Sequence, residues 1–200
     1  ISMEEGLDTG PVIEQESTFI SDKDNLEILA SRLSEISSKL LVNSLNKIKD
    51  TSGLNKIKRL EKLKAIDQSN LVGNITYARQ IRKEDYLINW NNNSRVVLKK
   101  IKGLYPYAYT IFKDKRIKIL DTNHISIKEN PLGNRFIDKN TKNVLKPGTI
   151  IMISKDQGII LTTKDSLLQI SYGQVQGKSK TDGFTLSLQL NLSINDVFGH

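Results

Sequence analysis

Asp8 is the first residue whose type and setting could do chemistry, because it lies in a short turn between two glycines. The segment reads Gly6-Leu7-Asp8-Thr9-Gly10. In most such turns the carboxylate only bonds nearby backbone amides, and on composition alone we expect that structural role. With donors supplied by other segments, the same carboxylate could orient a base and help to take up a proton.

The side chains that the sequence lacks exclude several kinds of site. The chain has no cysteine and two histidines, His124 and His200. A disulfide framework, a thiolate nucleophile and a cysteine-ligated zinc site are therefore excluded within it. We expect no metal site from two isolated histidines, and a surface position for each of them. No apolar run approaches the roughly 20 residues of a membrane helix, so we expect no membrane partner.

A second candidate for chemistry is the concentration of basic side chains in the middle of the chain. The whole chain carries 30 Lys and Arg against 22 Asp and Glu, a net charge of +8. Residues 51–120 hold 16 basic and 5 acidic side chains, which gives +11, against −5 before them and +2 after them. Clustered cations gain affinity for nucleic acid by releasing counterions from phosphates. A solvated basic surface is the alternative, and charge alone does not separate the two.

The first element that must position these residues is a long amphipathic helix. Residues 11–20 alternate in part and predict a β-segment, after which Ser21 and Asp24 could form the capping box of a helix through about residue 50. The apolar positions of that helix recur at steps of three and four from Leu26 to Leu40. The residues before it offer no sheet to cover this face. We therefore expect residues 1–50 to be poorly ordered or sticky in the 200-residue chain alone, and the chain itself to be a C-terminal fragment.

The rest of the chain predicts a linker followed by a barrel. Residues 51–73 form a basic interdomain linker, and from residue 74 short apolar runs alternate with turns. A helix is expected over 94–104, with Val97, Leu98, Ile101 and Leu104 on its inner face. Strands are expected over 108–112, 116–120, 149–154, 159–163, 167–172 and 185–194, the last from a strict period of two, and 121–148 form a surface excursion. Many short strands with few helices predict an OB-like open β-barrel.

Short motifs with a known counterpart are spread over the whole chain. Residues 3–13 read Met-Glu-Glu-Gly-Leu-Asp-Thr-Gly-Pro-Val-Ile, and further landmarks follow in order at 75–81, 83–85, 88–90, 100–107, 147–150 and 174–178. Together they resemble the formyltransferases that use 10-formyltetrahydrofolate, and within that family the branch that formylates methionyl-tRNA. Two positions depart from its pattern, because Ala108 replaces a proline and Ser179 replaces a basic residue.

The resemblance implies a fold and an activity. The fold class is α/β plus β: residues 1–50 are the C-terminal remnant, a strand and a long helix, of a Rossmann-like formyltransferase domain, 51–73 are the linker, and 74–200 are the OB-like barrel that binds tRNA. The activity is formyl transfer from 10-formyltetrahydrofolate to the amino group of initiator methionyl-tRNA. Asp8 would be catalytic together with an upstream Asn and His. The folate loop also lies upstream, so this fragment holds no cofactor-binding residue and we expect it to be inactive alone.

The resemblance also gives the basic cluster a task, which is to contact tRNA phosphates. Such contacts fix position and register and carry little sequence information. Three tyrosines, Tyr105, Tyr107 and Tyr109, could stack on bases; the expected alternative for Tyr107, as for Trp90, is packing in the core or at a hinge. The cluster consists of Lys56, Lys58, Arg59, Lys62, Lys64, Arg79, Arg82, Lys83, Lys99, Lys100 and Lys102.

Two other functions stay open at this point. One is a non-catalytic RNA- or tRNA-binding barrel, which steep salt dependence of binding without any chemistry would favour. The other is a relative that hydrolyses formyl-folate or formylates a sugar nucleotide, which indifference to tRNA would favour. For the full-length enzyme we expect a monomer in a bacterial-type cytoplasm or an organelle.

Overall fold

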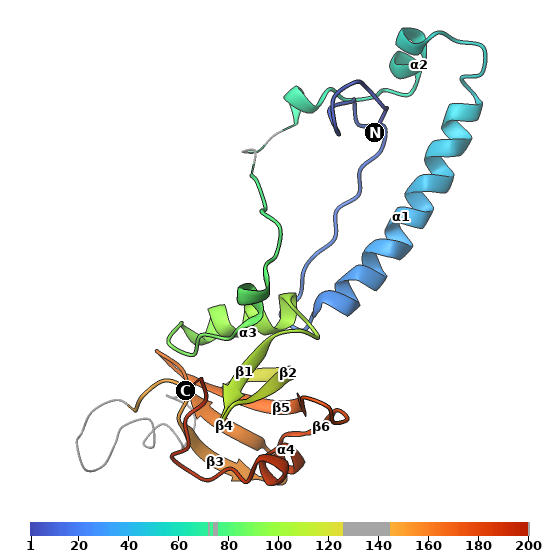
Figure 1. Ribbon diagram of the computed structural model, residues 1–200. Helices are drawn as coiled ribbons and strands as arrows, with labels where there is room; N and C mark the ends of the chain where they lie inside the picture. Colours follow the sequence, from blue (N-terminus) through green and yellow to red (C-terminus); the bar gives the residue numbers. More distant parts are fainter. Residues whose placement is uncertain (72, 74–75, 126–144, 200) are drawn as a thin grey trace. The chain divides into compact units, whose positions relative to one another are not determined.

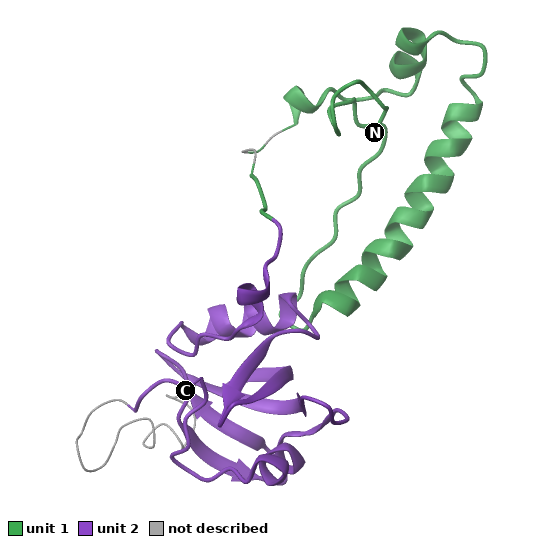
Figure 2. Cartoon of the chain, in the orientation of Figure 1, with its two compact units in different colours: residues 1–79 green, residues 80–200 purple. Residues whose placement is uncertain are grey.

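The computed structural model describes residues 1–71, 73, 76–125 and 145–199, and it contains two compact units. The first is Ile1–Arg79 and the second is Gln80–His200 (Figure 2). The linker expected over 51–73 lies inside the first unit and contains a short helix, α2 (Lys56–Lys62), and a 3-10 turn, η1 (Gln68–Asn70). The division of the chain into a catalytic remnant, a linker and a tRNA-binding domain stays a prediction.

The long helix of the first unit is confirmed, but it begins later than expected. Helix α1 (Leu26–Lys49) is capped by Asn25, whose side-chain oxygen accepts from the backbone N–H of Ile28 at 2.9 Å. The capping box at Ser21 is wrong as a helix start, because Asp24 serves a preceding turn. Its carboxylate accepts from the backbone N–H of Ser21 and pairs with Arg32 at 2.7 Å. None of the residues of α1 is buried.

The β-segment expected over 11–20 is wrong. Its one backbone pairing is an isolated bridge between Val12 and Ile66. The rest runs extended and antiparallel beside α1 (Figure 1), held by side chains: Glu14 pairs with Lys47, and Arg32 donates to the carbonyl of Phe19 at 2.8 Å. A strand needs a neighbouring strand for its backbone groups, and in the described part of this unit the neighbour is a helix.

The second unit is an antiparallel sheet with two helices. Its strands are β1 (Tyr109–Phe112), β2 (Lys115–Ile125), β3 (Ile150–Ser154), β4 (Gly158–Thr162), β5 (Leu167–Val175) and β6 (Thr181–Asp182). They follow the order β1-β2-β5-β4-β3, with β6 paired to β5. Five of the six expected strands are thereby confirmed. The barrel is not, because in the described residues no ladder joins β1 to β3 and the sheet is not closed.

The helices of this unit cover the sheet and carry part of its core. Helix α3 (Ser94–Gly103) packs against β2, and α4 (Gly183–Leu190) against β5 and β4 (Figure 1). The expected inner face of α3 is confirmed, with Val97 and Ile101 buried and Leu98 and Leu104 packed against the core. A short 3-10 turn, η2 (Lys83–Tyr86), comes before α3 in the chain.

The strand expected over 185–194 is wrong, because Leu186, Leu188 and Leu190 belong to helix α4. Asp182 caps this helix by accepting from the backbone N–H of Thr185 at 2.9 Å, and Asn191 ends it in a left-handed conformation. Leu186 and Leu190 are buried one turn apart, whereas Leu188 between them is 65% exposed. Leucine is a strong helix former, so capping and propensity prevail over the period-two pattern.

The surface excursion expected over 121–148 is wrong at its start. Strand β2 continues to Ile125, paired with β5 along its length, and His124 lies opposite Leu168 with its side chain exposed. The surface position expected for His124 is confirmed. Residues 126–144 and His200 lie outside the described residues.

Candidate functional site

The turn that holds Asp8 has a backbone fixed from a distant part of the chain. The side-chain amide of Gln68 donates to the carbonyls of Asp8 and Gly10, at 2.6 and 2.7 Å. Gly10 is buried, and a Cβ at this position would collide with the carbonyl oxygen of Ser2. Asp8 itself is in a left-handed conformation, with φ at 56°. The fold therefore fixes this turn beyond what its own glycines would do.

The carboxylate of Asp8 is exposed to solvent on this fixed turn. It lines an open pocket with a volume of about 470 Å³, which residues 1–10 form among themselves. Among the described residues no three His, Cys, Asp or Glu side chains gather in a way that could hold a metal ion. A lone carboxylate can accept a proton or orient a donor, but it cannot by itself stabilise an oxyanion. Any acyl transfer at Asp8 needs partner groups beyond those described.

Part of the expected basic cluster lies on and just after α2. Lys58 and Lys64 are exposed, whereas others of the group have partners inside the unit. Lys56 pairs with Glu4 at 3.3 Å, and Lys62 donates to the carbonyl of Asp50 at 2.7 Å. Arg59 is half-buried and donates to the carbonyl of Leu54 at 3.3 Å. Arg79 is exposed and is the last residue of the first unit.

The second unit brings the other expected cations to η2 and α3. Arg82 and Lys83 are exposed, and Lys99 is exposed on α3. Lys100 and Lys102 are half-buried. Burial lowers the pKa of Lys100, an effect that the nearby carboxylate of Asp85 opposes. The effect of Asp85 on Lys100 shows that η2 and α3 are close to each other at this point. The structure does not place them against the cations of α2, because the two groups belong to different units.

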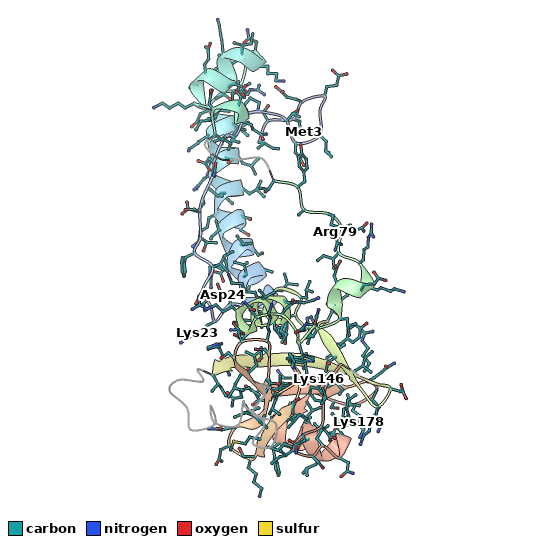
Figure 3. All side chains as sticks on the ribbon, turned by 90° about the vertical axis from the view of Figure 1, so that its left-hand side faces the viewer. Met3, Lys23, Asp24, Arg79, Lys146 and Lys178 are labelled. Atoms are coloured by element: carbon teal, nitrogen blue, oxygen red, sulfur yellow. The ribbon has the colours of Figure 1, made fainter. Side chains whose placement is uncertain are left out.

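Sequence reasoning missed a third group of cations, on strand β2. Arg116 and Lys118 line a pocket of about 320 Å³ with Tyr107, Gln174, Gln176 and Gly177. The signal was present in the sequence, because Arg116 and Lys118 alternate with Ile117 and Ile119, which are fully buried. Lys178, labelled in Figure 3, follows in the turn after β5.

The aromatic side chains divide between the core and this surface. Trp90 is 3% exposed and donates from Nε1 to Thr110 Oγ1 at 3.0 Å, so its expected place in the core is confirmed. Core packing is wrong for Tyr107, which is 51% exposed. Tyr107 lies in the turn between α3 and β1, next to Ala108, which is fully buried.

Comparison with known proteins decides the family. The family described as "Formyl transferase, C-terminal domain" matches residues 80–186, which is more than half of the chain. The chain belongs to the formyl transferase C-terminal domain family. Among curated relatives, the methionyl-tRNA formyltransferase of Prochlorococcus marinus strain NATL2A is 57% identical over 199 residues, and that of strain MIT 9313 is 34% identical over 207 residues.

The match spans the whole of this chain but only part of each relative. It covers 100% of this chain and 59% of each of the two relatives. Among solved structures, HypX from Aquifex aeolicus in complex with tetrahydrofolic acid is similar, with a TM-score of 0.61 and 13% identity over 96% of this chain and 30% of that one. At this identity the likeness shows the fold alone. Among the described residues no helix is long and apolar enough to span a membrane.

Proposed function

We propose that this chain is the C-terminal part of a methionyl-tRNA formyltransferase, acting in translation initiation. The observation that carries the proposal is the 57% identity to such an enzyme over the whole chain. The complete protein would transfer the formyl group of 10-formyltetrahydrofolate to the α-amino group of initiator methionyl-tRNA. We infer a cytoplasmic monomer that works without a metal.

In this proposal Asp8 is catalytic only together with groups outside the 200 residues. The amine of the methionyl ester would attack the formyl carbon, and negative charge would develop on the formyl oxygen. The bond from the formyl carbon to the folate nitrogen would then break, and tetrahydrofolate would leave with a proton on that nitrogen. The attacking amine would lose a proton. Asp8 would help to take up that proton and orient the base that receives it. The support is local: the carboxylate is exposed, and Gln68 fixes the turn by two hydrogen bonds to its backbone. Neutral donors to the oxyanion would come from partner residues.

The tRNA would be held by the basic residues of α2, η2 and α3, together with Arg79. These residues are the cations named from the sequence, and those of η2 and α3 lie within the matched family domain. Phosphate contacts by Lys and Arg supply affinity and register, and leave the choice of tRNA to other contacts. The open sheet of the second unit would serve as an OB-like platform for the same tRNA.

A chimeric enzyme tests the proposal. The part of the NATL2A relative that lies outside the match is joined to this chain, and formylation of methionyl-tRNA is measured with 10-formyltetrahydrofolate. We expect activity, and we expect Asp8→Asn to lower kcat/KM at least about a hundredfold, because a proton-transfer group of this kind contributes about 10² to 10⁴. Glu5→Gln removes a charge from the same exposed turn and serves as the matched control, with activity near that of the unmodified chimera.

Two results would contradict this proposal. A folded chimera that binds tRNA but does not formylate it would leave an RNA-binding module as the better account. Equal activity of the Asp8→Asn and Glu5→Gln chimeras would remove Asp8 from the chemistry while leaving the rest of the proposal in place.

A further inference from the structure

The pocket between β2 and the end of β5 is lined by two cations and, among its described lining residues, by no acidic side chain. Six residues line it: Tyr107, Arg116, Lys118, Gln174, Gln176 and Gly177. None of the six is acidic. Within the described ranges, the salt bridges involve neither Arg116 nor Lys118. Two unpaired cations in one concave site favour an anionic ligand.

Strand pairing places the two cations and the amide side chains of Gln174 and Gln176 on the same face of the sheet. Lys118 lies opposite Gln174, and the backbone N–H of Gln176 donates to the carbonyl of Arg116 at 3.0 Å. Because side chains alternate along a strand, positions 116, 118, 174 and 176 face the pocket while Ile117 and Val175 face the core. The amide nitrogen of Gln174 donates to the carbonyl of Lys178 at 2.7 Å, which leaves its oxygen as an acceptor.

Aromatic rings hold the cations and supply a stacking surface. The guanidinium carbon of Arg116 lies 3.8 Å from the ring centre of Tyr109, and Lys118 Nζ lies 5.5 Å from that of Tyr107. The rings of Tyr107 and Tyr86 pack edge to face with their centres 5.7 Å apart, and Tyr107 stays 51% exposed. There is open space at Gly177 on the lining of the pocket, because a Cβ there would meet nothing within 4 Å.

We propose that this pocket binds one unpaired nucleotide of an RNA, with the phosphate on Arg116 and Lys118 and the base stacked on Tyr107. The proposal rests on the proposed function, in which the partner is a tRNA. A guanidinium held on a ring matches phosphate oxygens, and base–aromatic stacking is the usual mode for unpaired bases. The glutamine amides can donate to or accept from a base edge. An acidic peptide would use the cations but leave the exposed ring unused.

Binding of labelled tRNA to the 200-residue chain over a range of salt concentrations tests the pocket. We expect Tyr107→Ala to lower affinity about fivefold or more with an unchanged salt slope, because stacking releases no counterions. Tyr107→Phe keeps the ring and should bind as the unmodified chain does. Arg116→Gln should lower affinity and reduce the slope of log K against log salt by about one. Melting curves check that each variant is folded.

Lys164→Gln is the matched control for charge. It removes one exposed cation from the same unit, just before β5 begins, whereas the pocket lies where β5 ends. We expect its affinity to stay within about twofold of the unmodified chain, since an isolated surface cation makes no fixed contact. A loss equal to that of Arg116→Gln would show that only total charge counts, and would overturn the pocket.

A small probe separates this inference from the proposed function. Adenosine 5′-monophosphate, ribose 5-phosphate and inorganic phosphate are each added while the amide signals of Lys118, Gln176 and Gly177 are followed by NMR. We expect the mononucleotide to shift them at concentrations where the other two do not. Equal shifts with all three compounds would overturn the proposed nucleotide site, and so would unchanged affinity of the Tyr107→Ala variant for tRNA. Either result would leave the proposed function intact. If the unmodified chain binds no tRNA, the tRNA partner is wrong, and the mononucleotide titration still tests whether the pocket binds a nucleotide.

Discussion

Asp165 shows how a single carboxylate fixes an element that is distant in sequence. Helix α3 has Asn93 at its N-cap position, whose side chain makes no capping bond. Asp165 from the β4–β5 turn accepts from the backbone N–H of Ser94 at 2.7 Å instead. Burial acts to raise the pKa of Asp165, but hydrogen bonds from Ser94 and Thr163 outweigh it and hold that pKa below its usual value. A negative charge is also favoured at a helix N-terminus.

Removing this carboxylate should destabilise the second unit in a pH-dependent way. Asp165→Ala should lower the free energy of unfolding by about 1 kcal/mol near neutral pH, as the loss of a helix cap does. Because the folded-state pKa is lowered, this contribution is complete above the usual aspartate pKa and is lost as pH falls through the lowered value. Melting curves of both proteins from neutral to acidic pH should therefore converge. An equal loss in Asp156→Ala, an exposed aspartate of the β3–β4 turn, would contradict the role of Asp165.

At the residue scale, the sequence predicts which side chains could act and misses what holds them. The glycine-bracketed turn around Asp8 is visible in the sequence, but nothing marks Gln68, 60 residues away, as the group that fixes it. For Tyr107 the sequence favours packing in the core or at a hinge over stacking on bases, because buried aromatic rings are the commoner case. In the structure Tyr107 is 51% exposed, and its small neighbour Ala108 is the buried one. Such long-range choices depend on the packing of other elements and leave no local pattern.

Helix α4 is the element on which sequence pattern and structure disagree most. A period of two would place Leu186, Leu188 and Leu190 on one buried face of a strand. In the helix they are instead separated, with Leu186 fully buried, Leu190 at 5% exposure and Leu188 at 65%. The two readings predict different costs for the same substitution.

Truncating these leucines one at a time distinguishes a helix from a strand. Leu186→Ala should lower the free energy of unfolding by about 2 to 5 kcal/mol, because it leaves a cavity in the core. Leu188→Ala should change it by less than about 0.5 kcal/mol, because the side chain is largely in solvent and alanine favours a helix. Denaturant unfolding of the two variants measures the difference. Similar large losses at both positions would restore the strand.

At the element scale, strands with buried alternation and the amphipathic helix α3 are predictable, and their ends are less so. β1, β3 and β4 match their expected ranges to within a residue, whereas β2 runs five residues past residue 120. That extension is polar, and it is a strand because β5 pairs with it from Asp121 to Ile125. Helix α1 begins later than the sequence predicts for a similar reason. Asp24 bonds Arg32 and Ser21, and Asn25 is the residue that caps the helix. Where a tertiary partner decides the boundary, local sequence does not.

At the scale of the whole chain, apolar burial is confined to one of the two units. Every buried hydrophobic side chain among the described residues lies between Ile88 and Phe198. The first unit is held by ion pairs such as Lys47 with Glu14 and by isolated backbone bonds, and Leu41 and Leu45 of α1 are more than half exposed. Exposed ion pairs contribute little to stability, while burial of apolar area supplies most of it. The expectation that residues 1–50 are poorly ordered in this chain alone therefore has a physical basis.

The two units should accordingly differ in stability when the 200-residue chain is studied by itself. A fragment of residues 80–200 should keep one cooperative unfolding transition with a midpoint within about 2 °C of that of the whole chain, because it retains the entire buried core. Hydrogen exchange should be fast along α1 and slow in β4 and β5, where the backbone bonds lie over fully buried residues such as Ile160 and Leu168. Slow exchange along α1 in a monomeric sample would contradict this, and so would an unfolded 80–200 fragment. Either result would mean that the first unit contributes stability through contacts other than apolar burial, and the charge networks around Asp24 and Glu14 would then be the groups to remove first.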